Sequence, residues 1–196
     1  MADRSGILVR VTLFPGLRQC AAVRQLRVPA EAPRVMEWLA DSDRREREWR
    51  RLVDAREDIQ QSSAGRLPNG GLRFDQVLRR GNLLLRHTTE DVALQEHRID
   101  RTHRAQLAGP RMMPLRWVMK ERVTVESLGD GTNITVRVWG RLAGMGRVLH
   151  LLGYRDTTTA RRLTEEASRR AGFCVAGVAA HFTGPHDTDV SADNAG

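Results

Sequence analysis

The stretch Val35–Trp49, VMEWLADSDRREREW, decides the fold of this chain. Val35, Trp38 and Leu39 fall at positions i, i+3 and i+4, a spacing typical of an amphipathic helix. Pro33 stands near the expected helix start, where its missing N–H costs nothing. The DSD triplet then breaks the helix, and a second, charged turn follows and ends on a tryptophan. Together with the strand-like LRVPA before it, the stretch predicts a first strand followed by two short helices.

Most of the chain after this stretch alternates between apolar and polar residues. The apolar residues that share a face are Val53, Ala55 and Ile59; Leu72, Phe74 and Leu78; Leu83 and Leu85; Val92 and Leu94; Met119, Val123 and Val125; and Ile134, Val136 and Val138. A period of two is typical of half-buried antiparallel strands. Glycine-containing turns at residues 68–71, 80–82 and 129–131 predict hairpins. With a strand around Ala22–Val28, the pattern predicts about seven strands.

The C-terminal part of the chain returns to a helical period. From Ala160 to about Ala180, small and apolar residues lie mainly three and four apart, with charged residues between them. Asp156, or one of the threonines after it, offers a capping oxygen. We therefore expect a long amphipathic helix over about Thr158–Ala180.

This order of elements resembles the helix-grip superfamily. That superfamily includes START lipid-transfer domains, birch-pollen-allergen-like proteins and bacterial polyketide cyclases. The stretch at residues 129–149, GDGTNITVRVWGRLAGMGRVL, resembles the bacterial cyclase-like members, and the likeness covers roughly residues 22–180. Those members carry a helix Trp where this chain has Met36, with Trp38 two places later. The resemblance implies an α+β fold, with a seven-stranded antiparallel sheet curled around a long C-terminal helix and two short helices after strand 1.

Length and composition predict one ligand-binding domain. With 196 residues, the chain is long enough for a real core. We expect an N-terminal extension with a possible extra strand over residues 1–21, the helix-grip domain over 22–182 and a disordered tail over 183–196. No apolar run reaches membrane-spanning length and no signal layout is present, so a cytoplasmic location is expected. Cys20 and Cys174 form no CxxC pair, so no zinc site is expected. No cofactor is expected either.

The net charge of +8 comes almost entirely from arginine, since Lys120 is the only lysine. The arginine clusters at residues 44–47 and 161–162 are interleaved with glutamates, which is typical of solvated helix faces. No recognised nucleic-acid-binding motif is present. We therefore expect no nucleic-acid partner, while the oligomeric state is left open.

The resemblance implies an internal apolar cavity between the sheet and the C-terminal helix. Small residues on the helix stripe leave room for a ligand. The expected ligand-binding residues are Phe74, Gln76, Trp117, Met119, Val136, Leu163 and Ala167. The segment Gln106–Trp117, which is apolar and punctuated by prolines, is expected to form either an entrance lid or a simple cap on the sheet.

Three ionisable residues in the apolar register, Glu57, His87 and Glu121, are candidates for catalysis. A carboxylate that faces an apolar cavity has a raised pKa and can act as a general acid or base. A histidine there can carry protons near neutral pH. The alternative is that His87 is exposed near a strand end and that the two glutamates pair with arginines at the cavity rim. A register slip of one residue would turn all three outward.

Two classes of function fit these features. The first is a cofactor-free enzyme of the polyketide cyclase/dehydratase type. Aromatase members of the superfamily line their pockets with arginine, tyrosine and other aromatic residues, whereas this chain has a single tyrosine, Tyr154. The second is a non-catalytic protein that carries or sequesters a natural product, as self-resistance proteins do for enediynes.

Overall fold

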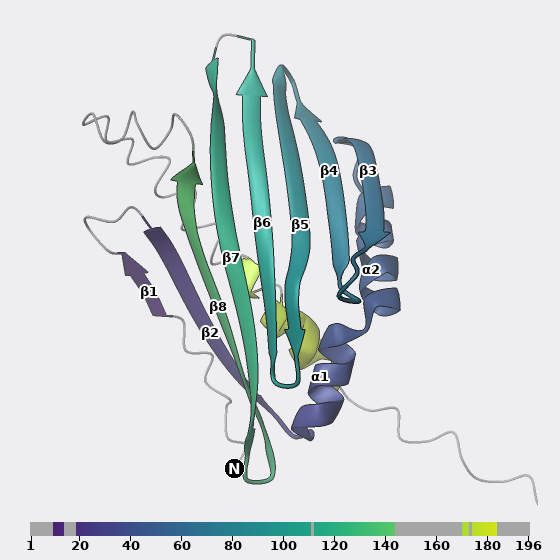
Figure 1. The fold of residues 1–196 in the computed structure, drawn as a ribbon, viewed down its shortest axis with the longest axis vertical. Helices are drawn as coiled ribbons and strands as arrows, with labels where there is room; N and C mark the ends of the chain where they lie inside the picture. The colour runs from purple at the N-terminus through teal and green to yellow at the C-terminus, as the bar shows by residue number, and fades with distance from the viewer. Residues whose placement is uncertain (1–9, 14–18, 111, 144–169, 173, 184–196) are drawn as a thin grey trace, which may run out of the picture.

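The computed structural model describes residues 10–13, 19–110, 112–143, 170–172 and 174–183. One antiparallel sheet runs in the order β1-β2-β8-β7-β6-β5-β4-β3 (Figure 1). Its strands are β1 (Arg10–Leu13), β2 (Gln19–Val28), β3 (Ile59–Arg66), β4 (Leu72–Arg80), β5 (Leu83–Gln95), β6 (Arg98–Gly109), β7 (Met112–Leu128) and β8 (Gly131–Ala143). Strands β2 to β8 make up the predicted number of seven, and β1 lies in the N-terminal segment, where an extra strand was possible. Two of the predicted segments, around residues 83–85 and 92–94, belong to one strand, β5, and β6 was not among the predicted alternating segments.

Two helices, α1 (Ala32–Ala40) and α2 (Ser42–Asp54), follow β2 as predicted. Asp41 separates them, and its side chain accepts a hydrogen bond of 2.9 Å from the backbone N–H of Arg44 at the start of α2. Helix α2 is longer than expected because ion pairs at i, i+4 spacing, such as Arg44–Glu48, support it. The strand register proposed for residues 53–58 was therefore wrong, since Val53 is helical and Glu57 lies in an exposed turn before β3.

The segment Gln106–Trp117, expected to form either an entrance lid or a simple cap, belongs instead to two long strands. Strand β6 continues to Gly109 and β7 begins at Met112, and these two residues pair with each other. Leu107 pairs directly with Leu115 across this hairpin. Proline is tolerated at Pro110 because that residue lies in the turn, where no ladder hydrogen bond is required.

A bulge in β5 changes one predicted register. Asp91 pairs with Arg101, and the next pair is Ala93 with Asp100, so one residue of β5 has no partner in the ladder. Val92 is that residue, and it is 56% exposed instead of facing inward. A bulge inserts one unpaired residue into a strand and so shifts which face the neighbouring side chains point to. The alternation of apolar and polar residues does not show where such an insertion occurs.

The core lies between the sheet and two helical segments. Helix α1 and the C-terminal helical residues 170–172 and 174–182 pack on one face of the sheet, which we call the inner face. Figure 1 shows the C-terminal segment, in yellow, behind the sheet beside α1. The buried apolar residues that meet there include Val35, Leu39, Ile99, Val123, Val125, Ile134, Val138, Val175, Val178 and Phe182. The part of the expected C-terminal helix before residue 170 lies outside the described residues.

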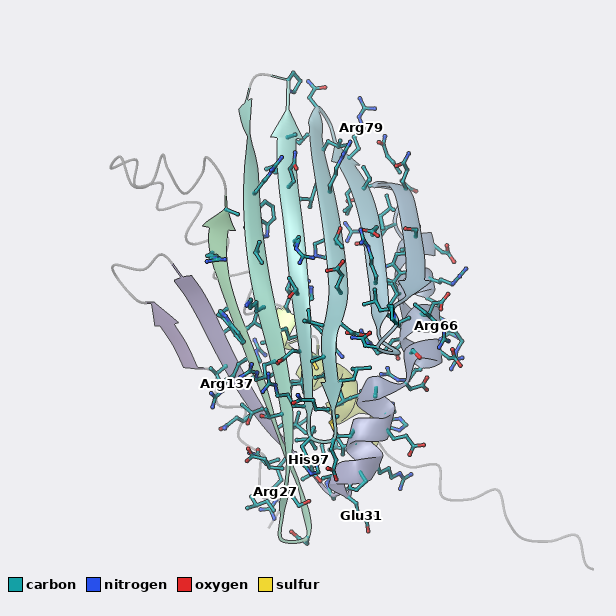
Figure 2. The ribbon with its side chains drawn as sticks, viewed as in Figure 1. Arg27, Glu31, Arg66, Arg79, His97 and Arg137 are labelled. Carbon is teal, nitrogen blue, oxygen red and sulfur yellow. The ribbon has the colours of Figure 1, made fainter. Side chains whose placement is uncertain are left out.

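The opposite, outer face carries many of the charged side chains (Figure 2). Arginines there pair with neighbouring carboxylates: Arg73 lies 2.7 Å from Asp75, and Arg122 lies 2.8 Å from Asp100. Within the described part of the chain, no helix is long and apolar enough to cross a membrane.

Candidate functional site

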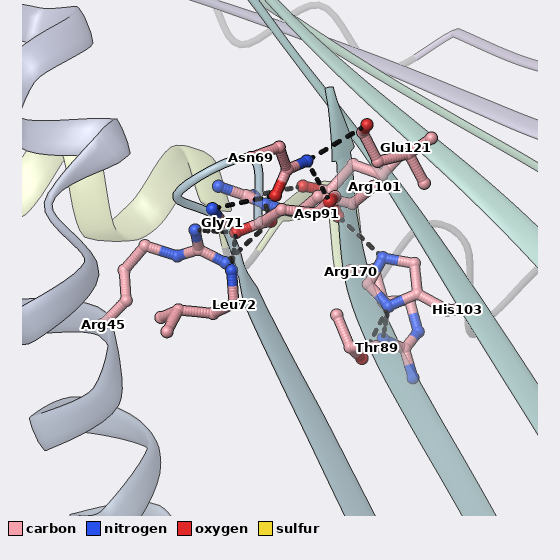
Figure 3. Close-up of polar contacts among 11 residues, drawn as sticks. Arg45, Asn69, Gly71, Leu72, Thr89, Asp91, Arg101, His103, Glu121 and Arg170 are labelled. Carbon is pink, nitrogen blue, oxygen red and sulfur yellow. Dashed lines mark hydrogen bonds and ion pairs between the residues drawn. The ribbon is translucent and has the colours of Figure 1, made fainter. Parts of the chain in front are cut away.

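A row of polar side chains crosses the inner face between the apolar residues (Figure 3). We call it the inner polar cluster, and its members are Arg45 of α2, His87, Thr89 and Asp91 of β5, Arg101 and His103 of β6, Glu121 of β7, and Arg170. The strand residues alternate along each strand, so they share one face. The register brings them side by side, since Thr89 pairs with His103 and Arg101 pairs with both Asp91 and Glu121.

Asp91 is the anchor of the inner polar cluster and is 0% exposed. Its carboxylate accepts hydrogen bonds from Arg45 at 2.6 and 3.0 Å, from Arg101 at 3.1 Å and from the backbone N–H of Leu72 at 2.9 Å. Burial alone would raise the pKa of Asp91, but the two arginines outweigh burial and hold the pKa below its ordinary value. The ionised carboxylate therefore ties α2, β4, β5 and β6 together.

The turn before β4 fits closely around Asp91. Asn69 donates to the backbone oxygen of Asp91 at 3.0 Å, and the Asn69 side-chain oxygen accepts from the N–H of Gly71 at 3.0 Å. A Cβ atom on Gly71 would lie 2.6 Å from the Cβ of Asp91. Only glycine fits at this position without displacing the buried carboxylate.

Glu121 is buried, with 5% of its surface exposed, as its inward register predicts. Arg101 donates to one of its oxygens at 2.6 Å, and Nε2 of His103 lies 3.3 Å from the other. Burial would raise the pKa of Glu121, but the charge of Arg101 and the hydrogen bond from His103 hold it well below its ordinary value. The expected raised pKa was wrong because this part of the inner face is charged and not apolar.

The hydrogen bonds around His103 fix its tautomer. Arg170 Nη1 lies 2.9 Å from Nδ1 of His103, and a guanidinium can only donate. Nδ1 must therefore be the unprotonated nitrogen, so the neutral ring carries its hydrogen on Nε2, which faces Glu121. Burial lowers the pKa of His103, which favours this neutral form. The hydroxyl of Thr89 also lies 3.0 Å from Nδ1.

His87 is half-buried and faces inward, as its register predicts. Its Nε2 lies 2.9 Å from Arg170 Nη2, so Arg170 bridges two imidazoles. The rings of His87 and His103 lie 6.0 Å apart and nearly parallel. His87 and Glu121, two of the predicted catalytic residues, thus belong to one cluster, whereas Glu57 is exposed and lies outside it.

The predicted ligand-binding residues are spread over the inner face. Phe74 is buried and stacks on Trp49 of α2 with ring centroids 4.9 Å apart. Gln76 is half-buried and pairs with His87 across β4 and β5. Met119 and Val136 are fully buried in the core. Leu163 and Ala167 lie outside the described residues, so the cavity that they would complete stays a prediction.

Beyond His87, three large apolar residues of the inner face whose side chains the structure describes are only half-buried. They are Leu85 of β5, Leu107 of β6 and Trp117 of β7, which we call the apolar strip. Leu85 pairs with Leu107, and Trp117 pairs with Ala105, which in turn pairs with His87. The apolar strip therefore adjoins the inner polar cluster. A separate groove of about 560 Å³ lies between α1 and the C-terminal helical residues 174–182, and its lining includes Trp38, His181 and Phe182.

Sequence reasoning missed most of the inner polar cluster. The sequence predicts a solvated helix face for Arg45 and the charged part of the C-terminal helix for Arg170, and its pattern gives no site role to Asp91 or Arg101. One usable signal was present, because aspartate is depleted in strand interiors and Asp91 lies inside β5. Within the residues described, no three His, Cys, Asp or Glu side chains are grouped as a metal ion would require.

Comparison with known proteins identifies the fold. No family model matches the sequence, and no curated protein matches it. Among solved structures, the Mll3558 protein from Rhizobium loti is 21% identical, with 82% of this chain and 96% of that chain covered and a TM-score of 0.50. Ara h 8.0201 is 13% identical, with 84% and 98% covered and a TM-score of 0.50. The Zhui aromatase/cyclase from Streptomyces sp. R1128 is 15% identical, with 84% and 94% covered and a TM-score of 0.49.

The comparisons and the order of the elements agree. A first long strand, two helices, six further antiparallel strands and a C-terminal helix packed on the sheet are all present in the described residues. This chain therefore has the helix-grip fold.

Proposed function

We propose that this chain binds a hydrophobic small molecule, a polyketide-like natural product or biosynthetic intermediate, against the inner face of the sheet. The observation that carries the proposal is the apolar strip. Leu85, Leu107 and Trp117 face inward yet stay partly exposed, whereas Met119, farther along β7, is 0% exposed. Trp117 also packs against the core, and within the described residues all three side chains are only half-buried. Partly exposed apolar side chains beside hydrogen-bonding groups are what an apolar ligand binds.

Polar groups stand at one end of the apolar strip. His87 lies between the strip and the rest of the inner polar cluster, and Gln76 is its neighbour on β4. Binding sites for small molecules combine apolar walls with a few placed hydrogen-bonding groups. A molecule with fused carbon rings and several carbonyl or hydroxyl oxygens matches this combination, because its rings would cover the strip while its oxygens reach His87 and Gln76.

The reaction proposed is a cofactor-free cyclisation or dehydration in which His87 transfers the proton. His87 adjoins the apolar strip, and histidine changes its charge near neutral pH. Glu121 cannot supply a proton there, since Arg101 and His103 keep its pKa well below the ordinary value. General acid–base catalysis contributes about 10²–10⁴-fold in rate. His87→Gln should reduce turnover of a poly-β-keto substrate by that order, whereas His97→Gln, at an exposed histidine, should leave it unchanged.

A second candidate function is binding without turnover, as a carrier or as a protein that sequesters a natural product such as an enediyne. The observation in its favour is that both carboxylates of the inner polar cluster are bonded to arginines. Neither Asp91 nor Glu121 is then available as a general acid. Tight binding with no turnover of any polyketide-like substrate would favour this second function over the first.

The binding proposal is tested by titrating 1,8-dihydroxyanthraquinone and following the quenching of tryptophan fluorescence. Leu85→Trp fills the inner face at the apolar strip, so it should raise the dissociation constant at least about tenfold, or 1.4 kcal/mol. Leu84→Trp is the matched control, because Leu84 is adjacent in β5 and faces the other side of the sheet. Equal affinities for both variants and the unmodified protein would contradict the proposal. Far-ultraviolet circular dichroism checks that each variant is folded.

A further inference from the structure

Three side chains on adjacent strands form a continuous hydrogen-bonded line. Thr89 Oγ1 of β5 lies 3.0 Å from Nδ1 of His103 on β6, and Nε2 of His103 lies 3.3 Å from Oε2 of Glu121 on β7. Thr89 and His103 are direct cross-strand partners, so the sheet itself holds them together. A hydroxyl, an imidazole and a carboxylate in this order are the arrangement that activates an oxygen nucleophile.

The surrounding residues hold this line in its reactive form. The donor Arg170 keeps Nδ1 of His103 unprotonated, so the nitrogen that faces Thr89 is the basic one. The Nε2–H then points at Glu121, and Arg101 holds the other Glu121 oxygen at 2.6 Å. Arg101 is fixed in turn by the buried Asp91 at 3.1 Å. Glu121 and Arg170 thus orient His103, Arg101 orients Glu121, and Asp91 orients Arg101.

We infer that Thr89 is a nucleophile with His103 as its general base, and that the chain hydrolyses activated acyl esters or thioesters with an apolar acyl group. Thr89 Oγ1 bonds to the acyl carbonyl carbon while its proton moves to Nδ1 of His103. The tetrahedral intermediate then expels the alcohol or thiol, which takes that proton from Nδ1. Water next attacks the acyl-threonine ester and gives a proton to Nδ1. Release of the carboxylic acid returns this proton to Thr89.

Arg170 has a defined part in this cycle. It shares the Nδ1 acceptor of His103 with Thr89, at 2.9 Å. When Nδ1 takes a proton, it can no longer accept a hydrogen bond, so Arg170 must turn away. The negatively charged oxygen of the tetrahedral intermediate forms beside Thr89 and offers Arg170 a new acceptor. Charge stabilisation of this kind is commonly the largest single contribution to acyl-transfer catalysis.

The inference rests on the proposed function in one respect, the position of the acyl chain. Residues two apart in a strand are about 7 Å apart, so Thr89, His87 and Leu85 run in sequence from the nucleophile to the apolar strip. An acyl chain attached at Thr89 could therefore extend past His87 onto Leu85. Thr89 is half-buried, so part of its surface remains exposed.

The test measures hydrolysis of p-nitrophenyl hexanoate together with the intact mass of the protein. The unmodified protein should release p-nitrophenol faster than buffer and gain one hexanoyl group, which peptide mapping should place on Thr89. Thr89→Val, which is isosteric, should lose at least about 100-fold in rate. Thr89→Ser should keep the rate within about tenfold. Thr88→Val is the matched control, because Thr88 bonds to Asp75 away from the cluster, and it should leave the rate unchanged.

The pH–rate profile of Glu121→Gln distinguishes a role of Glu121 in orienting His103 from a role in the stability of the fold. Its hydrogen bond raises the pKa of His103, so Glu121→Gln should move the acidic limb of the pH–rate profile to lower pH as well as slow the reaction. The inference is overturned if Thr89→Val hydrolyses the ester as fast as the unmodified protein, if the acyl group maps to another residue, or if the unmodified protein shows no hydrolysis above buffer. Anthraquinone binding measured on the same proteins reports on the proposed function independently.

Discussion

Replacing Asp91 by asparagine should destabilise the fold by about 3–5 kcal/mol, the usual cost of removing one partner of a buried ion pair. The carboxylate is 0% exposed and is bonded to Arg45, Arg101 and the N–H of Leu72. Asparagine keeps the shape but removes the charge, so the ion pair of Arg45 with Asp91 is lost and Arg101 keeps only its pair with Glu121. In a protein of this length, 1 kcal/mol shifts the melting temperature by about 2–4 °C, so the expected loss is about 6–20 °C.

Urea unfolding followed by far-ultraviolet circular dichroism measures this change at pH 7. The matched control is Asp130→Asn, since the Asp130 side chain is 93% exposed although it also pairs with an arginine at 2.6 Å. That control should change the free energy of unfolding by no more than about 1 kcal/mol. A loss below about 1 kcal/mol for Asp91→Asn would refute the role of the inner polar cluster as an anchor.

The pKa shift of Asp91 also predicts how the stability difference between the unmodified protein and Asp91→Asn depends on pH. The pKa of Asp91 is lowered in the folded state, so its contribution to stability is present above the unfolded value of about 3.9 and is lost as the pH falls through the folded value. The difference in unfolding free energy between the unmodified protein and Asp91→Asn should therefore shrink below about pH 4. A difference that stays constant from pH 7 to pH 3 would contradict the assignment.

Two further substitutions test the core and the turn beside it. Met119→Ala should lower the free energy of unfolding by about 2–5 kcal/mol because Met119 is fully buried. Val92→Ala, at an exposed bulge residue, should change it by no more than about 0.5 kcal/mol, and urea unfolding measures both. Gly71→Ala should lower the melting temperature because its Cβ would lie 2.6 Å from the Cβ of Asp91. Gly65→Ala, whose Cβ would have nothing within 4 Å, should lower it far less. Equal effects would show that the close approach of Gly71 to Asp91 is not needed for stability.

The fold could be predicted because its elements follow from periodicity. The alternation of Ile134, Val136 and Val138 gives the correct register of β8, and all three are fully buried. The i, i+3, i+4 spacing of Val35, Trp38 and Leu39 likewise gives α1. The end of α2 and the bulge at Val92 could not be predicted, because ion pairs along a helix and a single unpaired residue leave no trace in an apolar pattern.

The candidate site was predicted only in part. The strand registers correctly predicted that His87 and Glu121 face inward, but the apolar–polar pattern predicted an inner face that is apolar throughout. Arg101 and His103 alternate in phase with Ile99, so they could have been assigned to the same face. Arg45 and Arg170 could not, because their contacts with Asp91 and His103 join residues 46 and 67 positions apart in the sequence.

Intermolecular nuclear Overhauser effects test most directly whether an apolar ligand binds at the apolar strip. A sample with labelled leucine methyl groups and saturating 1,8-dihydroxyanthraquinone provides the measurement. We expect cross-peaks from the aromatic protons of the ligand to the methyl groups of Leu85 and Leu107, and none to the methyl groups of Leu84 on the other side of β5. Cross-peaks confined to Leu39, a buried core residue of α1, or the absence of cross-peaks to Leu85 and Leu107, would contradict this binding site.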